Sequence, residues 1–169
     1  MPKSTSEINQ EVAYELSNNL SRLLREFAKD FENRIFSKLQ ASGYAEIRPA
    51  HSAVFANLGM GAVRVTELAE RAQVTQQAMG KMLKEIERMG YIARDVDSED
   101  KRAKEIRLTA KGVKLAEDSL VIVKQVRSEY AEVIGESDLS KLEKMLRNSV
   151  DKINLTYLPE SWSDSSAAG

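Results

Sequence analysis

The feature that most restricts the fold of this chain is a pair of short helices, joined by a tight turn and followed at once by two alternating segments. In residues 65–91, VTELAERAQVTQQAMGKMLKEIERMGY, Thr66 and Thr75 are suitable N-caps for the two helices, and Gly90 ends the second. Their apolar faces are Leu68, Ala69 and Ala72 in the first helix, and Ala78, Met82, Ile86 and Met89 in the second. YIARDVD and KEIRLT then alternate apolar and polar residues, which predicts two half-buried strands joined by the charged loop DSEDKRA.

Amphipathic helices also precede and follow this unit. Apolar residues recur from Ile8 onward in steps of three and four, which predicts one long helix that ends near Gly43. A shorter helix begins near Pro49 and ends by Gly59 or Gly61. The stripe of the long helix comprises Ile8, Val12, Leu16, Leu20, Leu24, Phe27, Phe31 and Ile35.

Two further helices are predicted after the strands. Thr109 caps the first of them, and a break at GESD separates it from the last. Their stripes are Val113, Ala116, Leu120, Val123, Tyr130 and Ile134 in one, and Leu139, Leu142, Met145 or Leu146, Ile153 and Tyr157 in the other. The terminal helices have too little core of their own, so they would bury these stripes best against each other or against a second copy of the chain.

Composition narrows the chemistry. The 169 residues include no cysteine and a single histidine, His51, which excludes disulfide scaffolds, thiolate catalysis and zinc sites built from several imidazoles. Neither a signal peptide nor a membrane-spanning stretch is recognisable, so we expect a soluble, cytoplasmic protein. No nucleophile–base pair, phosphate loop or metal cluster is present in the pattern, so we expect neither an enzyme nor a bound cofactor.

The second helix of the pair has a side suited to reading DNA. Opposite its apolar face it presents Gln76, Gln77, Gly80, Lys81, Lys84 and Arg88. Amides can pair with adenine edges, and amines can reach phosphates or guanine. An exposed glycine inside a helix costs about 1 kcal/mol relative to alanine, a cost that close approach of another backbone would explain. An ordinary solvated helix surface carries the same residue types, so the helix alone does not decide the function.

The charged hairpin strengthens the DNA-binding interpretation. Arg102 lies near the loop tip, where a guanidinium can enter a minor groove. Asp100 can hold a neighbouring arginine, for which Arg94 is suitable, and Lys101 and Lys104 would add phosphate contacts. The whole chain has a formal net charge of −1, but residues 64–111 carry eleven basic and nine acidic side chains, so any basic surface is local.

DKRAKEIRLTAKG, residues 100–112, resembles the wing signature of the MarR (multiple antibiotic resistance regulator) family of winged-helix transcription factors. The matching residues, at the family's spacing, are Asp100, Arg102, Leu108, Thr109 and Gly112. LKEIERMGYIAR resembles the end of the family's recognition helix with the first wing strand, and RPAHSAVFANLG resembles its second helix. The resemblance covers nearly the whole chain.

The resemblance implies a homodimer, joined through the first and last helices, that binds double-stranded DNA at a near-palindromic operator and usually represses transcription. It also implies a pocket between the dimer helices and the DNA-binding lobe, where a small aromatic or anionic ligand weakens DNA binding. Carried over by position, the DNA contacts are Thr75, Gln76, Gln77, Lys81 and Lys84 in the recognition helix, and Asp100 and Arg102 in the wing with Arg94 in support.

The predicted fold is therefore mainly α: a winged helix-turn-helix with a two- to three-stranded β wing, flanked by long N- and C-terminal dimerisation helices. We expect residues 47–109 to form the DNA-binding lobe, and residues 1–46 with 110–158 to form the helical dimerisation region. The small polar segment 159–169 is expected to be a disordered tail.

Two positions depart from the family pattern. Gln73 occupies the turn where a residue tolerant of left-handed backbone is common, and Arg48 stands where a capping threonine is common. Tyr44, Arg48 and His51 are candidate contacts for an anionic aromatic ligand. His51 has two other readings, as a reporter of pH or as a partly exposed helix residue that makes one backbone hydrogen bond.

Winged helices also mediate protein–protein contacts, so an interaction module without DNA binding is the alternative function. Such a module would show exposed apolar residues between Thr75 and Lys84, where this chain has amides and amines.

Overall fold

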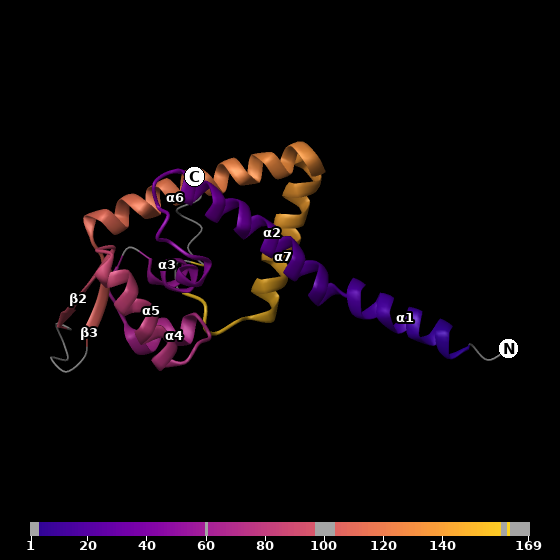
Figure 1. The fold of residues 1–169 in the computed structure, drawn as a ribbon, viewed down its shortest axis with the longest axis horizontal. Helices are drawn as coiled ribbons and strands as arrows, with labels where there is room; N and C mark the ends of the chain where they lie inside the picture. The colour runs from indigo at the N-terminus through magenta and orange to yellow at the C-terminus, as the bar shows by residue number, and fades with distance from the viewer. Residues whose placement is uncertain (1–3, 60, 97–103, 160–161, 163–169) are drawn as a thin grey trace.

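The computed structural model describes residues 4–59, 61–96, 104–159 and 162 (Figure 1). In chain order its elements are α1 (Thr5–Asn18), α2 (Leu20–Ala41), the 3-10 turn η1 (Pro49–His51), α3 (Ser52–Leu58), β1 (Val63–Arg64), α4 (Val65–Arg71), α5 (Gln76–Arg88), β2 (Ile92–Val96), β3 (Lys104–Leu108), α6 (Ala110–Ile134) and α7 (Glu136–Ile153). The protein is mainly α-helical with one small antiparallel sheet, which confirms the predicted fold class.

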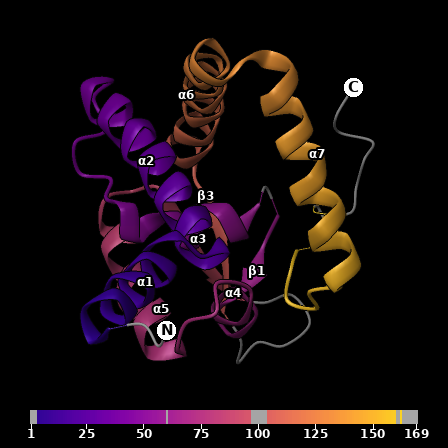
Figure 2. The same ribbon diagram turned by 90° about the vertical axis from the view of Figure 1, so that its right-hand side faces the viewer.

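The helices form two groups. We call α3, α4 and α5 with the sheet the lobe, and α1, α2, α6 and α7 the frame. Helices α3 to α5 gather beside the β2–β3 hairpin, and α6 runs above them (Figure 1). Helix α6 packs against both α2 and α7, which lie on opposite sides of it (Figure 2). Helix α1 projects away from the rest of the chain toward the N-terminus.

The sheet has the strand order β1-β3-β2, with antiparallel pairing throughout. Ile106 of the central strand pairs with Val63 on one side and with Arg94 on the other. Ile92 and Ile106 are buried, as the alternation of apolar residues predicts, and Val63 of the third strand is buried with them. The third strand, β1, comes from the short extended stretch before α4, so the sheet has three strands rather than two.

The turn between α4 and α5 keeps helix-turn-helix geometry despite its unusual residue. Gln73 adopts φ of +54°, in the left-handed region, and its side-chain amide donates to the Glu70 carbonyl at 2.8 Å. The predicted N-cap of α4 was wrong: the cap position is Arg64, and Thr66 lies within the first turn. Helix α4 starts two residues earlier than expected because it follows β1 without a connecting loop.

The N-terminal helix is not continuous, contrary to the prediction. It breaks at Asn19, whose backbone is extended, and α2 begins at the next residue. The Asn19 side chain accepts the Arg22 backbone N–H at 3.0 Å and donates to the Leu16 carbonyl at 3.0 Å. An asparagine that caps both helix ends offers the backbone a local alternative to helix, which apolar periodicity alone does not reveal.

The inner face of α5 also differs from the prediction. Met79, Leu83 and Ile86 are fully buried, whereas Ala78 is exposed, and Met82 and Met89 are only partly buried. The predicted stripe is thus shifted around the helix by about one residue. Leucine and methionine bury more apolar surface than alanine, so the core selects the phase that takes Met79 and Leu83 inward.

Helices α6 and α7 bury fewer of their predicted residues. Gly112, Leu115, Ile122 and Val126 form the buried row of α6, and Leu120, predicted to be buried, is 62% exposed. In α7 only Leu139 is buried, and Tyr157 lies beyond the helix end at Ile153. Helix α6 has apolar residues on more than one face, so periodicity could not tell which face meets α2.

Most of the predicted tail, residues 160–161 and 163–169, lies outside the described residues. Trp162 is described, and its indole N–H donates to Asp151 Oδ1 at 3.3 Å. The guanidinium of Arg147 lies 5.2 Å from the centre of the Trp162 ring. Both partners belong to α7, so this part of the tail lies against the last helix.

The lobe and the frame share one buried cluster, which includes Leu39 of α2, Leu83 of α5, Ile106 of β3 and Val126 of α6. The contact that joins them most closely is at the start of α6. The Thr109 hydroxyl donates to the Gly90 carbonyl at 2.6 Å and accepts the Gly112 N–H at 3.1 Å. The Thr109 N–H donates to the Tyr91 carbonyl at 3.0 Å. The end of α5 and the start of α6 are therefore held together through the backbone.

We predict that Gly112→Ala destabilises the fold by about 1–3 kcal/mol, measured by urea unfolding. A Cβ at this position would lie 2.0 Å from the Tyr91 carbonyl oxygen, so strand and helix must separate to admit it. The control is Gly80→Ala, where the new methyl meets nothing within 4 Å and should raise the stability of the helix by up to about 1 kcal/mol. Equal effects of the two substitutions would contradict the close contact at Gly112.

Candidate nucleic-acid interface

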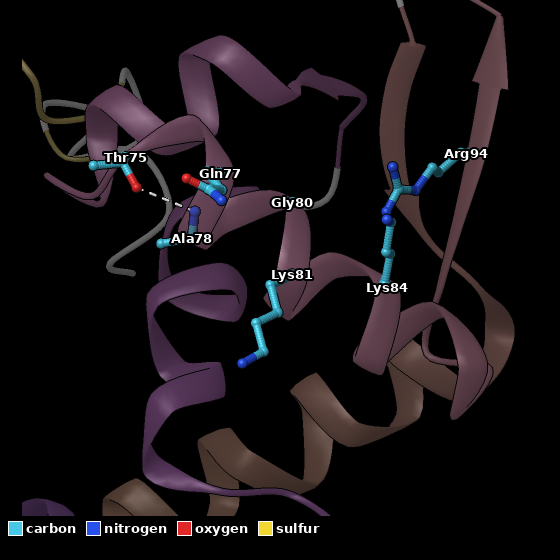
Figure 3. Close-up of a pocket in the computed structure, with 7 residues that line it drawn as sticks. All are labelled: Thr75, Gln77, Ala78, Gly80, Lys81, Lys84 and Arg94. Carbon is cyan, nitrogen blue, oxygen red and sulfur yellow. Dashed lines mark hydrogen bonds between the residues drawn. The ribbon is translucent and has the colours of Figure 1, made fainter.

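The outer side of α5 forms a hollow at the surface of the lobe. We call it the α5 hollow. It is lined by Thr75, Gln77, Ala78, Gly80, Lys81, Lys84 and Arg94 (Figure 3). All of these residues come from α5 and its N-cap except Arg94, which comes from β2. The hydroxyl of Thr75 accepts the Ala78 N–H at 3.1 Å, so the cap holds the first turn in place.

The acidic residues of α5 are neutralised on its inner side. Glu85 pairs with Arg48, and Glu87 Oε2 lies 2.9 Å from Arg94 Nε. By contrast, Lys81, Lys84 and Arg88 are exposed, and none of them makes an ion pair within the described parts of the chain. The side of α5 that faces solvent is therefore positively charged although the helix as a whole carries two acids.

Arg94 occupies an unusual position at the edge of the hollow. Its side chain is mostly buried, and among the described residues neither Nε nor Nη2 has a hydrogen-bond partner of good geometry, despite the nearby Glu87 carboxylate. Lys84 and Arg94 point toward one another from α5 and β2 (Figure 3). Glu87 already offsets the charge of Arg94, but Arg94 Nη2 has no partner among the described residues, so an anion beside Lys84 could also accept a hydrogen bond from it. A phosphate would satisfy both.

The structure thus brings together most of the residues predicted to bind DNA. Thr75, Gln77, Lys81, Lys84 and Arg94 line one hollow, and Gln76 is exposed beside it at the start of α5. The predicted wing residues Asp100, Lys101 and Arg102 lie outside the described residues, so the proposed Asp100–Arg94 contact stays a prediction. Lys104 is the first residue of β3.

His51 is buried, with 1% of its surface exposed, which corrects the expectation of a partly exposed residue. Its Nδ1 accepts the Arg48 backbone N–H at 3.1 Å, as one of the predicted alternatives required. Its Nε2 lies 3.3 Å from Glu85 Oε2, which fits a ring that carries its proton on Nε2. The His51 hydrogen bond and the charge of Arg48 hold the pKa of Glu85 below its usual range. The start of α3 is thereby connected to α5.

Tyr44, the third candidate ligand contact, belongs to a different cluster. Its hydroxyl donates to Asp118 of α6, and this hydrogen bond raises the pKa of Tyr44 to about 12. The neighbouring Tyr91 donates to Glu46 Oε1 at 2.5 Å, and burial raises the pKa of Tyr91 above its usual value. Tyr44 is therefore held by the frame, whereas Arg48 and His51 are held by α5.

Within the described segments, no group of three or more histidine, aspartate or glutamate side chains is placed to hold a metal ion. Nor does any helix of those segments have the length and apolar character needed to cross a membrane.

Comparison with known proteins identifies the lobe. Residues 45–103 match the family model described as the MarR family. Over this segment the chain is similar to the winged-helix proteins of the MarR family. Over 96 residues it is 29% identical to the exopolysaccharide II synthesis transcriptional activator ExpG of Rhizobium meliloti, an alignment that covers 57% of this chain and 50% of ExpG. The chain thus spans about half the length of this curated relative.

Solved structures share the fold beyond the matched segment. Wild-type MarR from E. coli, in its apo form, superposes with a TM-score of 0.68 at 20% identity, over 79% of this chain and 98% of that one. A mutant of S. aureus MepR bound to an oligodeoxyribonucleotide superposes with a TM-score of 0.54 at 21% identity, over 81% of this chain and 99% of that one. The long frame helices are therefore part of the MarR-like fold.

Sequence reasoning missed two features of this candidate site. It placed Ala78 inside, although Ala78 lines the α5 hollow. It also gave no role to Glu85 and Glu87, which neutralise Arg48 and Arg94. The first could have been found from the greater apolar character of Met79 and Leu83. The second could not, because the partners lie 37 residues apart in one case and on a different element in the other.

The raised pKa of Tyr44 predicts a loss of stability in alkali. A pKa that is higher in the folded state, about 12 against 10.0, means that the contribution is complete below pH 10 and is lost as the pH rises toward 12. Tyr44→Phe should therefore lower the free energy of unfolding at pH 8 and flatten its decline between pH 10 and 12. Urea unfolding across this range measures both effects. The matched control is Tyr14→Phe at an exposed position of α1, and identical curves for Tyr44→Phe and the unmodified protein would contradict the assignment.

Proposed function

We propose that this protein is a homodimeric transcription regulator that binds a near-palindromic DNA operator through α5 and the β2–β3 hairpin. The observation that carries the proposal is the outer face of α5. There amides stand beside lysines that pair with no acid among the described residues, while the acids of the same helix are paired on the inner side. Amides supply base readout, and cations supply phosphate contacts. The oligonucleotide bound to the related MepR mutant and the activator function named for ExpG support the same conclusion.

The alternative, a protein-interaction module, has less support from the surface of the lobe. Among the described residues, the large exposed apolar side chains lie in α1, the first part of α2, α6, α7 and at Trp162. None of them belongs to α3, α4, α5 or the sheet. A lobe that docks on protein would present such residues at its contact face. This lobe presents charge and amides instead.

The exposed apolar residues support the second part of the proposal, the homodimer. They form rows on the terminal helices, including Leu16 in α1, Leu20 in α2, Val133 in α6 and Met145 in α7. Contiguous apolar surface of this kind marks an interface in a water-soluble chain. The frame made by residues 1–46 and 110–158 would then join two copies and set the spacing of two α5 helices, about one helical turn of DNA apart.

We further propose repression that is relieved by a small aromatic or anionic ligand, on the basis of the family resemblance at residues 100–112. Tyr44, Arg48 and His51 are its candidate contacts. Because these side chains already bind Asp118 and Glu85, a ligand would have to displace those partners and so disturb α5. ExpG is named an activator, so the sign of regulation is tested directly, with a reporter gene behind the operator, with and without the protein.

Two variants should distinguish the loss of base readout from the loss of phosphate contacts. Gln77→Ala should reduce discrimination between operator and unrelated DNA by about 1–3 kcal/mol. Lys84→Ala should weaken binding to all sequences alike and lower the slope of log K against log salt concentration by about 1. Fluorescence anisotropy, on an operator selected from random duplexes at several salt concentrations, measures both. The control is Lys141→Ala, at a lysine of α7 that pairs with Asp138, and binding by either variant that equals the control would count against α5 as the DNA-binding element.

The homodimer predicts a second outcome. Leu20 is 71% exposed in the single chain, so Leu20→Glu should leave the monomer folded but place a charge in the proposed interface. Burial of an unpaired charge is strongly unfavourable, and the dimer should dissociate at concentrations where the unmodified protein stays paired. Sedimentation velocity measures the change, with Gln10→Glu on a polar side of α1 as the control. A monomeric unmodified protein would refute the dimer.

A further inference from the structure

Gly80 is the least expected residue of α5. A glycine within a helix lowers its stability relative to alanine, because the backbone of the unfolded chain has more freedom to lose. At Gly112 the close contact with the Tyr91 carbonyl explains the glycine. At Gly80, however, a Cβ would meet nothing within 4 Å. The packing of the described residues therefore gives no reason for glycine at this position, and a group that approaches α5 from outside would supply one.

Polar side chains lie one helical turn before and one turn after Gly80. Gln77 precedes it by one helical turn and Lys84 follows it by one turn, so the three residues stand in a single row on the helix. Ala78 contributes a methyl group and Gly80 only its Cα to the lining, whereas Gln77 and Lys84 contribute hydrogen-bond donors on either side of them; the Lys81 side chain points away from this pair (Figure 3). The α5 hollow thus suits a small apolar group that sits directly beside a hydrogen-bond acceptor.

One base edge of the DNA major groove has this chemistry. Thymine presents its C5-methyl group next to the O4 acceptor, whereas cytosine presents a donor and the purines have no methyl. Three residues advance about 4.5 Å along a helix, and base pairs are spaced by about 3.4 Å. When Gln77 reads one base pair, Gly80 therefore faces a neighbouring pair, and a Cβ at position 80 would occupy the space that the methyl needs.

We propose that Gly80 is a specificity-determining residue, whose missing side chain lets the α5 hollow receive the methyl group of a thymine in each operator half-site. The inference rests on the proposed DNA-binding function and adds to it the base that this part of α5 selects. The glycine lowers the stability of the helix, but it permits a contact that forms only when DNA is bound.

The test first selects operators from random duplexes with the unmodified full-length protein, which should return a fixed thymine in each half-site. Deoxyuridine, which differs from thymidine in the methyl group alone, then replaces each thymine of one half-site in turn. At one position the unmodified protein should lose about fourfold in affinity, the factor that corresponds to one buried methyl. Gly80→Ala should bind the thymine operator at least about tenfold more weakly, because its methyl would occupy the space of the thymine methyl. At that position it should lose nothing further on the deoxyuridine duplex.

Asn148→Ala, at an exposed polar position of α7, is the matched control for a change that adds helix propensity far from the lobe. Its thermal midpoint and that of Gly80→Ala should both equal or exceed the midpoint of the unmodified protein, and only Gly80→Ala should lose DNA affinity. A variant that is stable and weak in binding separates the role in the groove from any role in folding.

The outcomes are distinct. If Gly80→Ala binds as tightly as the unmodified protein, or if no single deoxyuridine weakens binding, the thymine contact is refuted while the DNA-binding function stands. If Gly80→Ala weakens binding equally on every duplex and remains sensitive to each methyl, the glycine admits the DNA backbone instead, and the proposal is wrong. If the unmodified protein selects no duplex at all, both the proposed function and this inference fail.

Discussion

The contact of Thr109 and Gly112 with the backbone at Gly90 and Tyr91 is the constraint on which the rest of the structure depends. Thr109 caps α6 and at the same time bonds to the segment that ends α5, and Gly112 lets the first turn of α6 lie against the Tyr91 carbonyl. Lys111 adds a cation at the last carbonyls of α5, with its amine 2.8 Å from the Met89 oxygen. The start of α6 and the segment that ends α5 are therefore joined directly by hydrogen bonds to the backbone. This contact fixes the position of α5 relative to the long frame helices.

The distribution of charge around α5 explains how a nearly neutral chain can offer a local basic surface. Each acid on the helix is held by a base from another element, Glu85 by Arg48 and Glu87 by Arg94. The lysines on the opposite side are left to act on a ligand, and the N-terminal end of the helix adds a partial positive charge. The same pairing connects the start of α3 to the middle of α5 through His51. The surface that would bind DNA and the contacts that orient it are thus made by opposite sides of one helix.

Much of this architecture could be predicted from the sequence. The caps at Thr75 and Thr109, the end of α5 at Gly90 and the two long strands follow from residues whose preferences act over a few positions. The break at Asn19 and the start of α4 were missed, because asparagine side chains and an adjoining strand compete locally with helix periodicity. The inner faces of α5 and α6 were assigned to the wrong rows for a different reason. Both helices have several apolar residues off the main row, and only the neighbouring elements decide which row is buried.

For the candidate site, the residue types on α5 were set by the sequence alone: amides and amines at helical spacing, with a glycine among them. Local sequence determines this because helix geometry fixes which side chains share a face. What only the tertiary structure decided is which charges remain available. Glu87 and Arg94 meet because β2 returns along α5, and His51, Arg48 and Glu85 meet because η1 packs on the same helix. Such pairings join residues distant in the chain, and no local preference encodes them, so they arise only when the core brings the elements together.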